Sequence, residues 1–227
     1  MALTMGFTNY LSLNSAPTAG NTVHANVRFI PPAGTPWSAI YYVSGAHVGR
    51  ANMTGTPLYA SDRSGTDFLG SQVIGNNIWY ALTWSWDGTT DKVYVNGDLE
   101  ISTTGMNFVT SRAITTIGSY GTASNNGENT FFDGVKVWQA VLTQQEIRNE
   151  VGSIKPKRFQ DLWAWLPCNN GSVVGADYSG SSRSFTQSGT VAESAPSSTA
   201  WGDSHMLIPQ ANTGLIYRQS PLMLSAC

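Results

Sequence analysis

The chain has 227 residues, 41% of them hydrophobic and 11% aromatic, so it can bury a sizeable core without a metal or a disulfide. Only 11% of the residues are charged, where about 25% is usual, and the formal net charge is −2. Neutralising nucleic-acid phosphates needs a basic surface, so we expect no nucleic-acid partner. No apolar run of about 18 residues occurs, so we expect no membrane span. The N-terminal residues show no secretion signal.

Alternation of apolar and polar residues is the main pattern in the first part of the chain. Over residues 22–29 every second side chain is apolar, which is typical of a strand with one buried face. The apolar set is Val23, Ala25, Val27 and Phe29, and the polar set is Thr22, His24, Asn26 and Arg28. Pro31-Pro32 ends the strand because proline cannot donate to a β-ladder. His24 lies on the polar face, so we expect an exposed imidazole.

The strongest β-pattern lies in residues 79–97. Alternate apolar residues from Tyr80 to Trp86 share one face, and we expect the core to contain Trp84, Trp86 and Trp138. Asp87-Gly88 is a turn signal, and Asn96-Gly97 predicts a two-residue hairpin. Further strands are expected at 40–43, 58–61, 114–117, 131–138 and 162–166.

One short helix is predicted after residue 143. Thr143 and Glu146 have the spacing of a capping box, in which each side chain accepts from the other residue's amide. Leu142 and Ile147 occupy the positions of a hydrophobic staple around this cap. Gly152 is expected to close the helix, because glycine tolerates the left-handed conformation found there.

Three blocks of sequence, in this order, resemble the laminin-G-like domains, which are concanavalin A-like lectin/glucanase jelly rolls. The blocks are 79–97, which ends in Tyr94-Val95-Asn96-Gly97, then 114–118, and finally 132–147. The resemblance covers roughly residues 5–152. It implies an all-β fold, namely a two-sheet antiparallel β-sandwich (jelly roll) with one short helix.

The order of segments then departs from the family pattern. Residues 162–167, followed by Asp177-Tyr178-Ser179-Gly180, resemble the segment that normally opens such domains, but here they follow the closing helix. Either the domain is permuted, with residues 162–190 supplying the opening strand, or a second, incomplete module begins here. We favour permutation, because about 75 residues are few for another sandwich. We therefore expect one sandwich domain over residues 1–200.

Residues 201–227 predict an extended C-terminal arm. Apolar triplets alternate there with Pro209, Gly214 and Pro221, whereas a disordered tail would lack such anchors. We expect the arm to bind through Trp201, Leu207, Ile208, Leu215, Ile216, Tyr217, Leu222 and Leu224. Two uses of the arm are open: it adds to a neighbour's sheet edge or groove, or it covers an edge of its own sandwich.

The sequence lacks the signatures of catalysis, so we expect no enzyme. No Glu-x-Asp-x-Glu run supplies the paired carboxylates of a glycan hydrolase. The only histidines are His24, His47 and His205, and no Gly-x-Ser-x-Gly elbow is present. Asp203-Ser204-His205 has the residue types of a triad, but triad members are rarely adjacent in sequence.

Two kinds of residue are candidates for binding a ligand. Relatives often bind calcium through loop carboxylates, and Asp87, Asp91, Asp133 and Asp177 are the candidates here. Aspartate is also a preferred turn residue, which is the simpler interpretation. Trp37 and Trp201 are the tryptophans we expect to be most exposed, and hence available to stack on a sugar.

Two functions fit these observations. Similar arrangements occur among proteins of phages, and this resemblance favours a non-catalytic virion component, either a head decoration or a tail-associated protein. Such a protein is assembled in the host cytoplasm and binds other virion proteins or copies of itself. The alternative is a lectin module that binds glycans, with calcium left open as its cofactor. A glycan hydrolase or lyase ranks last.

Overall fold

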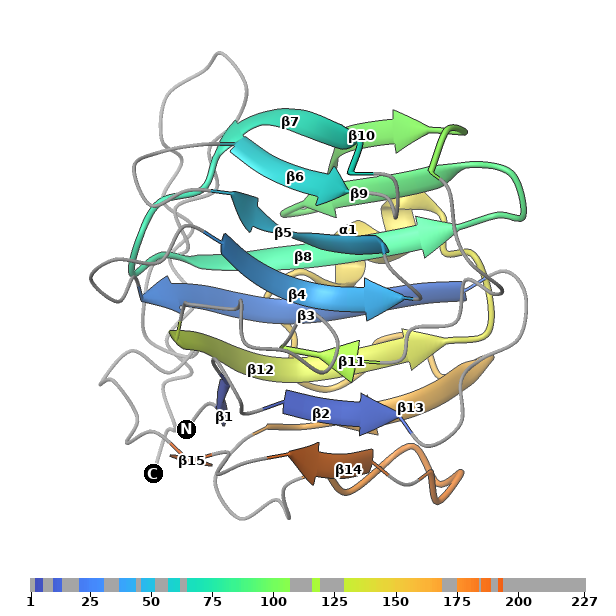
Figure 1. The fold of residues 1–227 in the computed structure, drawn as a ribbon. Coiled ribbons are helices and arrows are strands. Elements are labelled where there is room, and N and C mark those ends of the chain that lie inside the picture. Colours follow the sequence, from blue (N-terminus) through green and yellow to red (C-terminus); the bar gives the residue numbers. More distant parts are fainter. Residues whose placement is uncertain are drawn as a thin grey trace, which may run out of the picture.

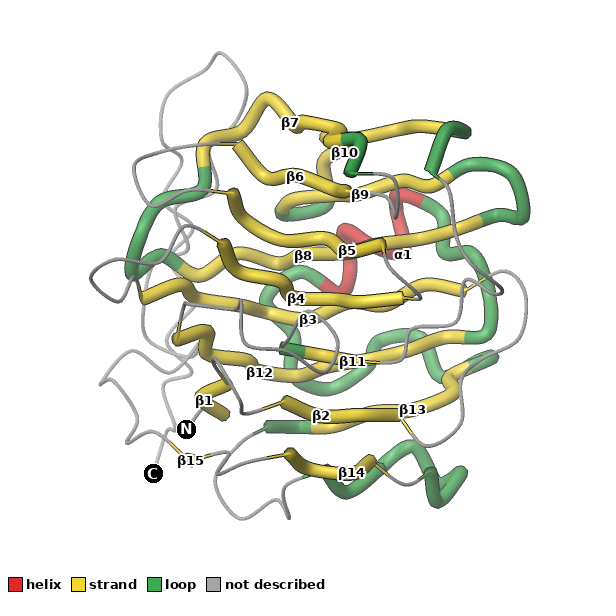
Figure 2. The backbone as a smooth tube through the Cα atoms, in the orientation of Figure 1, coloured by secondary structure: helices red, strands yellow, loops and turns green. Residues whose placement is uncertain are grey.

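The computed structural model describes residues 3–5, 10–13, 21–30, 37–43, 46–51, 57–61, 65–106, 116–118, 129–168, 175–183, 185–188 and 192–193. In this part of the chain, two antiparallel sheets lie face to face, and one short helix lies behind them (Figures 1 and 2). The predicted all-β sandwich with one helix is confirmed. No helix among the described residues has the length and apolar character that crossing a membrane requires.

Each sheet is built from strands that are distant in sequence. The eight-stranded sheet has the order β10 (Asp98–Thr103), β9 (Asp91–Val95), β8 (Trp79–Trp86), β3 (Asn21–Ile30), β12 (Asn129–Trp138), β1 (Leu3–Met5) and β15 (Ala192–Glu193), and β13 (Leu162–Leu166) also pairs with β12. The seven-stranded sheet has the order β14 (Phe185–Ser188), β2 (Tyr10–Leu13), β11 (Thr116–Ile117), β4 (Trp37–Val43), β5 (Ala46–Ala51), β6 (Pro57–Ser61) and β7 (Asp67–Val73).

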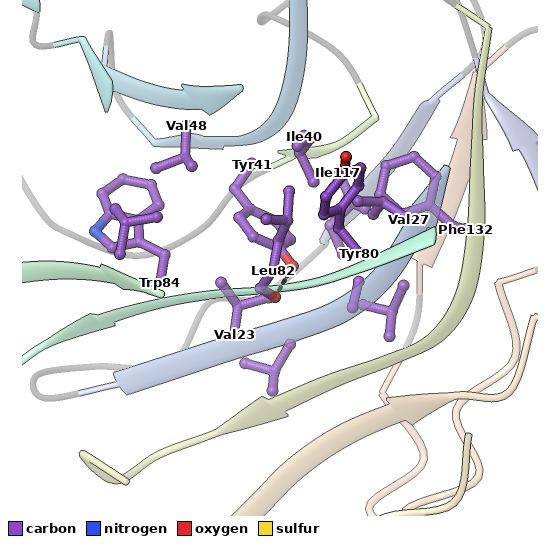
Figure 3. Close-up of a cluster of buried hydrophobic side chains, with 14 of the residues drawn as sticks. Val23, Val27, Ile40, Tyr41, Val48, Tyr80, Leu82, Trp84, Ile117 and Phe132 are labelled. Carbon is purple, nitrogen blue, oxygen red and sulfur yellow. Dashed lines mark hydrogen bonds between the residues drawn. The ribbon is translucent and has the colours of Figure 1, made fainter. Parts of the chain in front are cut away.

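The core lies between the two sheets. It contains the predicted apolar face of β3, whose four apolar side chains are all fully buried, and the apolar face of β8 (Figure 3). Tyr41 crosses the core, and its hydroxyl donates to the backbone oxygen of Leu82 at 2.9 Å. Trp84 and Trp138 are buried as predicted, and Trp86, at the end of β8, is half-buried.

Helix α1 (Gln144–Glu150) begins and ends as the sequence predicts. Thr143 and Glu146 form the complete capping box, and the staple residues Leu142 and Ile147 are both buried. The helix ends before Gly152, whose φ is 70°. A small apolar cluster that includes Tyr94 and Trp138 packs the helix onto the outer face of the eight-stranded sheet. About two turns of helix are marginal alone, so this packing stabilises the element.

The Asn96-Gly97 hairpin fixes the position of α1. Both turn residues have positive φ, 51° and 86°, as a type I′ turn requires. The Gly97 oxygen accepts from Gln144 Nε2 at 3.0 Å, and a Cβ on Gly97 would lie 2.6 Å from Arg148 Cγ. Glycine at position 97 therefore permits the positive φ of the turn and also leaves room for the close approach of α1.

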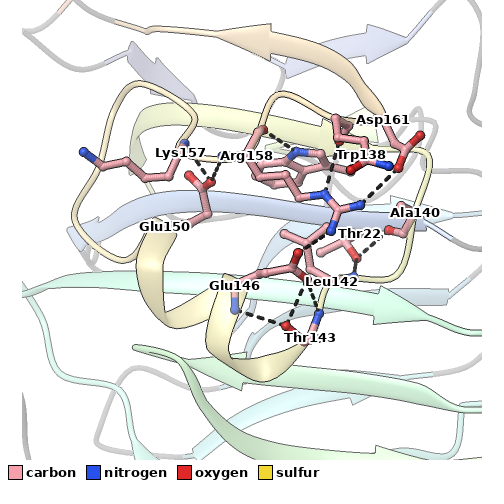
Figure 4. Close-up of polar contacts among 11 residues, drawn as sticks. Thr22, Trp138, Ala140, Leu142, Thr143, Glu146, Glu150, Lys157, Arg158 and Asp161 are labelled. Carbon is pink, nitrogen blue, oxygen red and sulfur yellow. Dashed lines mark hydrogen bonds and ion pairs between the residues drawn. The ribbon is translucent and has the colours of Figure 1, made fainter.

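A buried ion pair joins α1 to the sheet below it. Lys136 Nζ on β12 donates to Glu150 Oε2 at 2.7 Å, and both side chains are buried. The other oxygen of Glu150 accepts from the backbone amides of Lys157 and Arg158 at 2.8 and 2.9 Å (Figure 4). The Arg158 guanidinium pairs in turn with Glu146 and Asp161. The carboxylate thus fixes both the helix and the segment that follows it.

Strand β12 changes partner along one edge, and Gly134 marks the change. Residues Thr130–Phe132 pair with β1, whereas Val135–Trp138 pair with β13. Gly134 has a φ of 64° and lies in a bulge of the β12–β3 register. A Cβ on Gly134 would lie 2.8 Å from the Cα of Ile154, which crosses above it.

The segment that follows the helix adds strands to both sheets. β13 pairs with β12, β15 pairs with β1, and β14 pairs with β2. The strands β13, β14 and β15 are therefore part of the same two sheets as the strands that precede the helix. The arm at residues 201–227, and with it the domain boundary at residue 200, lies outside the described residues.

We expect Gly134→Ala to lower the free energy of unfolding by about 2 kcal/mol or more, because it combines a positive φ with a backbone clash. Gly88→Ala is the control: Gly88 also has a positive φ, 102°, but a Cβ there would meet no atom within 4 Å. Urea denaturation of both variants measures the difference. Equal losses would show that the close approach of Ile154 costs nothing.

We expect Lys136→Met to lower the free energy of unfolding by about 3–5 kcal/mol, because it leaves a buried carboxylate without its counter-ion. Lys136→Met combined with Glu150→Gln should lose less than the sum of the two single losses. The control is Arg148→Met, which breaks the exposed Arg148–Asp98 pair and should cost under about 1 kcal/mol. If the double variant lost as much free energy of unfolding as the two single variants together, the interaction between Lys136 and Glu150 would be contradicted.

Candidate functional site

An arginine lies between two aromatic rings on the outer face of the eight-stranded sheet. Arg28 on β3 is in register with Trp79 on β8 and with Phe131 on β12, so the three side chains share one face. The guanidinium carbon lies 5.4 Å from the centroid of the Trp79 ring and 4.6 Å from that of Phe131. We call these three residues the Arg28 site.

Among the described residues, few contacts compensate the guanidinium of the Arg28 site for its burial. Arg28 and Trp79 are half-buried, and Phe131 is buried. Arg28 Nε is covered and has no hydrogen-bond partner, and no carboxylate of the described residues forms an ion pair with this side chain. Burial lowers the pKa of Arg28 below its ordinary value. The rings attract the cation through their π faces but supply no negative charge.

The turn before β8 holds Trp79 at this place. The Asn77 amide donates to the Phe29 oxygen at 2.8 Å, and the Gly75 amide donates to the Tyr80 hydroxyl at the same distance. Asn77 adopts a positive φ of 57°, which asparagine tolerates better than most residues. The start of β8 is thereby fixed beside the end of β3.

Sequence reasoning missed the Arg28 site. Its members are 50 or more positions apart, and the pairing of β3 with both β8 and β12 brings them together. A weak signal was present: Trp79 and Phe131 are aromatic residues at positions where alternation calls for polar side chains, next to Tyr80 and Phe132 on the core face. An aromatic residue on a polar face is a candidate for ligand contact.

A second arginine stacks on an aromatic ring in a different setting. The Arg183 guanidinium carbon lies 4.9 Å from the centroid of Trp163, and its Nε is likewise covered and without a hydrogen-bond partner. Trp163, however, belongs to the core and packs edge-to-face on Phe185. Arg183 therefore covers one core tryptophan, whereas Arg28 is enclosed by two rings.

Two described residues on the outer face of the seven-stranded sheet are also buried. Thr116 and His47 occupy outer positions of β11 and β5, because their neighbours Ile117 and Val48 point into the core. Thr116 is only 6% exposed and His47 8% exposed. These residues are less accessible to a ligand than the Arg28 site.

The expectation of an exposed His24 is wrong. His24 is 1% exposed, and its Nδ1 lies 2.9 Å from the Thr83 hydroxyl on β8. The polar face of β3 was expected to face solvent, but α1 and the segment after it cover this part of the sheet. Burial, reinforced by Lys136, lowers the pKa of His24 well below its ordinary value.

Three of the four candidate aspartates are engaged by hydrogen bonds of their own. Asp87 accepts from the amides of its own turn, and Asp91 is buried beside Trp84, whose indole donates to it at 3.2 Å. Asp177 accepts from three backbone amides around it, and burial raises the pKa of Asp133 to about 7. In the described ranges, no three His, Cys, Asp or Glu side chains gather as metal ligands would.

The predicted residues of the C-terminal arm lie outside the described residues, as does Trp201. The backbone of Trp37 lies in β4, but its side chain is outside what the structure describes. The contacts expected of these residues stay predictions.

The comparison with protein families decides the assignment of this sandwich. Residues 6–148 match the model of the concanavalin A-like lectin/glucanases superfamily. The chain belongs to this superfamily. The hairpin that holds α1 and the capped start of this helix fall within the matched residues of this lectin-type domain, whereas β1, β13, β14 and β15 lie outside them. No curated protein matches the chain.

Solved structures of this fold include two informative neighbours. A proposed carbohydrate binding protein from Bacteroides ovatus is similar with a TM-score of 0.62 at 16% identity, covering 85% of this chain and 60% of that one. The present chain thus spans less than two thirds of that protein. The heptameric SAP-like pentraxin of Limulus polyphemus is similar with a TM-score of 0.54 at 14% identity, covering 76% of this chain and 94% of the pentraxin. At these identities the likeness concerns the fold.

We expect the protein to lose stability as the pH falls from about 6.5 to about 4. Burial keeps His24 neutral and lowers the pKa of His47 to about 4, whereas both histidines titrate near 6.5 when unfolded. The unfolded chain therefore binds two more protons there. Asp133, with its raised pKa, offsets one of them, because its folded form holds a proton that the unfolded form releases. The net slope is about 1.4 kcal/mol per pH unit.

The variant His24→Gln removes one of the two side chains that take up a proton on unfolding. The free energy of unfolding should therefore depend less steeply on pH in this range. Urea denaturation at several pH values measures both slopes. A variant slope as steep as that of the wild type would contradict a buried neutral His24.

Proposed function

We propose that the protein is a non-catalytic carbohydrate-binding module. The observation that carries this proposal is its place in a lectin-type superfamily, together with an aromatic site on the outer sheet face. The similar fold of a proposed carbohydrate binding protein supports the same conclusion. The alternative interpretation from the sequence is therefore better supported than the virion component.

The Arg28 site has features that suit a sugar. Trp79 is half-buried, so part of the indole is open to the C–H groups of a pyranose ring, and its position is fixed by backbone pairing. The guanidinium beside it donates hydrogen bonds and accepts none, which matches the oxygens of a glycan. An aromatic ring and a fixed polar donor form the usual combination of a binding site.

The three glutamates whose side chains the structure describes have structural partners, which supports a role without catalysis. Glu150 is neutralised by Lys136, and Glu146 caps α1. Glu100 lies two residues after Asp98 on β10, so this one pair has carboxylates at alternate positions. The two carboxylates are held apart by their partners, because Asp98 pairs with Arg148 while Glu100 accepts from the amides of Ser71 and Gln72 on β7. A hydrolase needs such a pair free to act on one glycosidic bond.

Membership of a phage virion stays a prediction. A virion protein can also bind host glycans, so the two functions are compatible. The contacts with neighbouring subunits that were expected of the sandwich and of the arm at residues 201–227 likewise stay predictions.

We expect the purified full-length chain to bind glycans on an array, and Trp79→Leu to weaken this binding about tenfold, the cost of losing one anchoring aromatic. Phe159→Ala is the matched control, because Phe159 is an aromatic residue that is 55% exposed at a different place. Equal binding by Trp79→Leu and the wild type would contradict the site, and an array without any bound glycan would contradict the function. Adding a chelator tests whether a metal takes part.

A further inference from the structure

We propose that the Arg28 site recognises the carboxylate of an acidic sugar, such as a uronic acid residue within a glycan chain. This inference rests on the proposed function and names the chemical class of the ligand. It follows from the surroundings of one guanidinium.

Arg28 is the only member of the polar face of β3 that reaches solvent. Thr22, His24 and Asn26 are buried on that face, whereas Arg28, at the far end, is half-buried. No described carboxylate pairs with it, and its Nε is covered without a partner. The other described arginines on this side of the molecule, Arg148 and Arg158, both have carboxylate partners. Among the described residues this partly desolvated cation has no anion, and the free energy that this costs would be recovered by a ligand carboxylate.

The geometry of the guanidinium suits a carboxylate. A guanidinium is planar, and two of its N–H groups match the two oxygens of a carboxylate. Because Nε is covered, the ligand must meet the terminal nitrogens, while the rings of Trp79 and Phe131 restrict the rotation of the guanidinium. Restricting the side chain before binding reduces the entropy lost on binding.

The charge around the site favours an isolated carboxylate over a dense polyanion. The chain has a net charge of −2, and Lys136, a described cation on the same face, is neutralised by Glu150. One guanidinium can bind one carboxylate, but a nucleic acid or a heavily sulfated chain requires several free cations in a row. The indole beside the guanidinium adds an apolar surface for the sugar ring, which an acidic peptide would not use in the same way.

The test compares one polysaccharide in two charge states. Isothermal titration calorimetry measures binding of the full-length protein to polygalacturonate and to its methyl ester, which has the same sugar without the charge. We expect the free acid to bind at least about tenfold more tightly, in keeping with one charge-assisted contact. We expect Arg28→Lys, which keeps the charge and the aliphatic stem, to lose most of this preference, because an ammonium lacks the planar pair of donors.

Arg183→Lys is the matched control, since Arg183 also stacks on a tryptophan and has a covered Nε. It should bind the free acid as the wild type does. Thermal unfolding of each variant reports its folding, and the comparison of acid with ester on the wild-type chain needs no variant.

The outcomes separate this inference from the function on which it rests. Equal binding of acid and ester, or binding of neutral glycans only, overturns the acidic-sugar inference and leaves the carbohydrate-binding function standing. Equal losses in Arg28→Lys and Arg183→Lys overturn the assignment to Arg28. Poly-glutamate that binds as tightly as polygalacturonate overturns the choice of a sugar. Failure of both acidic and neutral glycans to bind overturns the function as well.

Discussion

The ion pair between Lys136 and Glu150 is the interaction on which the outer layer of this sandwich depends. It is fully buried, so each charge has lost its hydration and relies on the other and on the backbone groups around it. Glu150 meets that demand with two further amides from the segment after α1, and Lys136 with the oxygen of Ser153. A short helix with little stability of its own is thus held on the sheet, and the polar residues beneath it are shielded from water.

Shielding by the helix divides the outer face of the eight-stranded sheet into two parts. Near α1, the polar side chains of β3 are covered, and each has a hydrogen-bond partner: His24 bonds Thr83 on β8, while Thr22 and Asn26 donate to the backbone oxygens of Ala140 and Ser153. Four residues along the same strand, about 13 Å away, Arg28 reaches solvent between two aromatic rings. The same alternating strand therefore supplies a structural layer at one end and a candidate ligand site at the other.

The sequence was informative where structure is set by neighbours along the chain. Strand alternation, the Asn96-Gly97 turn and the Thr143–Glu146 capping box all depend on residues a few positions apart, and all three were predicted correctly. The exposed His24 was predicted wrongly, because the covering helix comes about 120 positions later and periodicity carries no information about it. The Arg28 site was missed for the same reason, since its three residues lie on three strands that only the sheet register aligns.

The edges of the sandwich bear on how it could meet a partner. At one side, β7 and β10 end the two sheets, and Glu100 of β10 accepts from the Ser71 and Gln72 amides of β7 at 2.8 and 3.0 Å. A strand added to β7 at this point would replace hydrogen bonds to a carboxylate with hydrogen bonds to backbone oxygens. This exchange is unfavourable, because hydrogen bonds to a charged acceptor are stronger. Leu69 and Val73 remain exposed on the same strand, but the amides between them are occupied. At the opposite side, β14 and β15 end the sheets. Because Glu100 occupies the amides of Ser71 and Gln72, the β7 edge is closed to strand addition at this point.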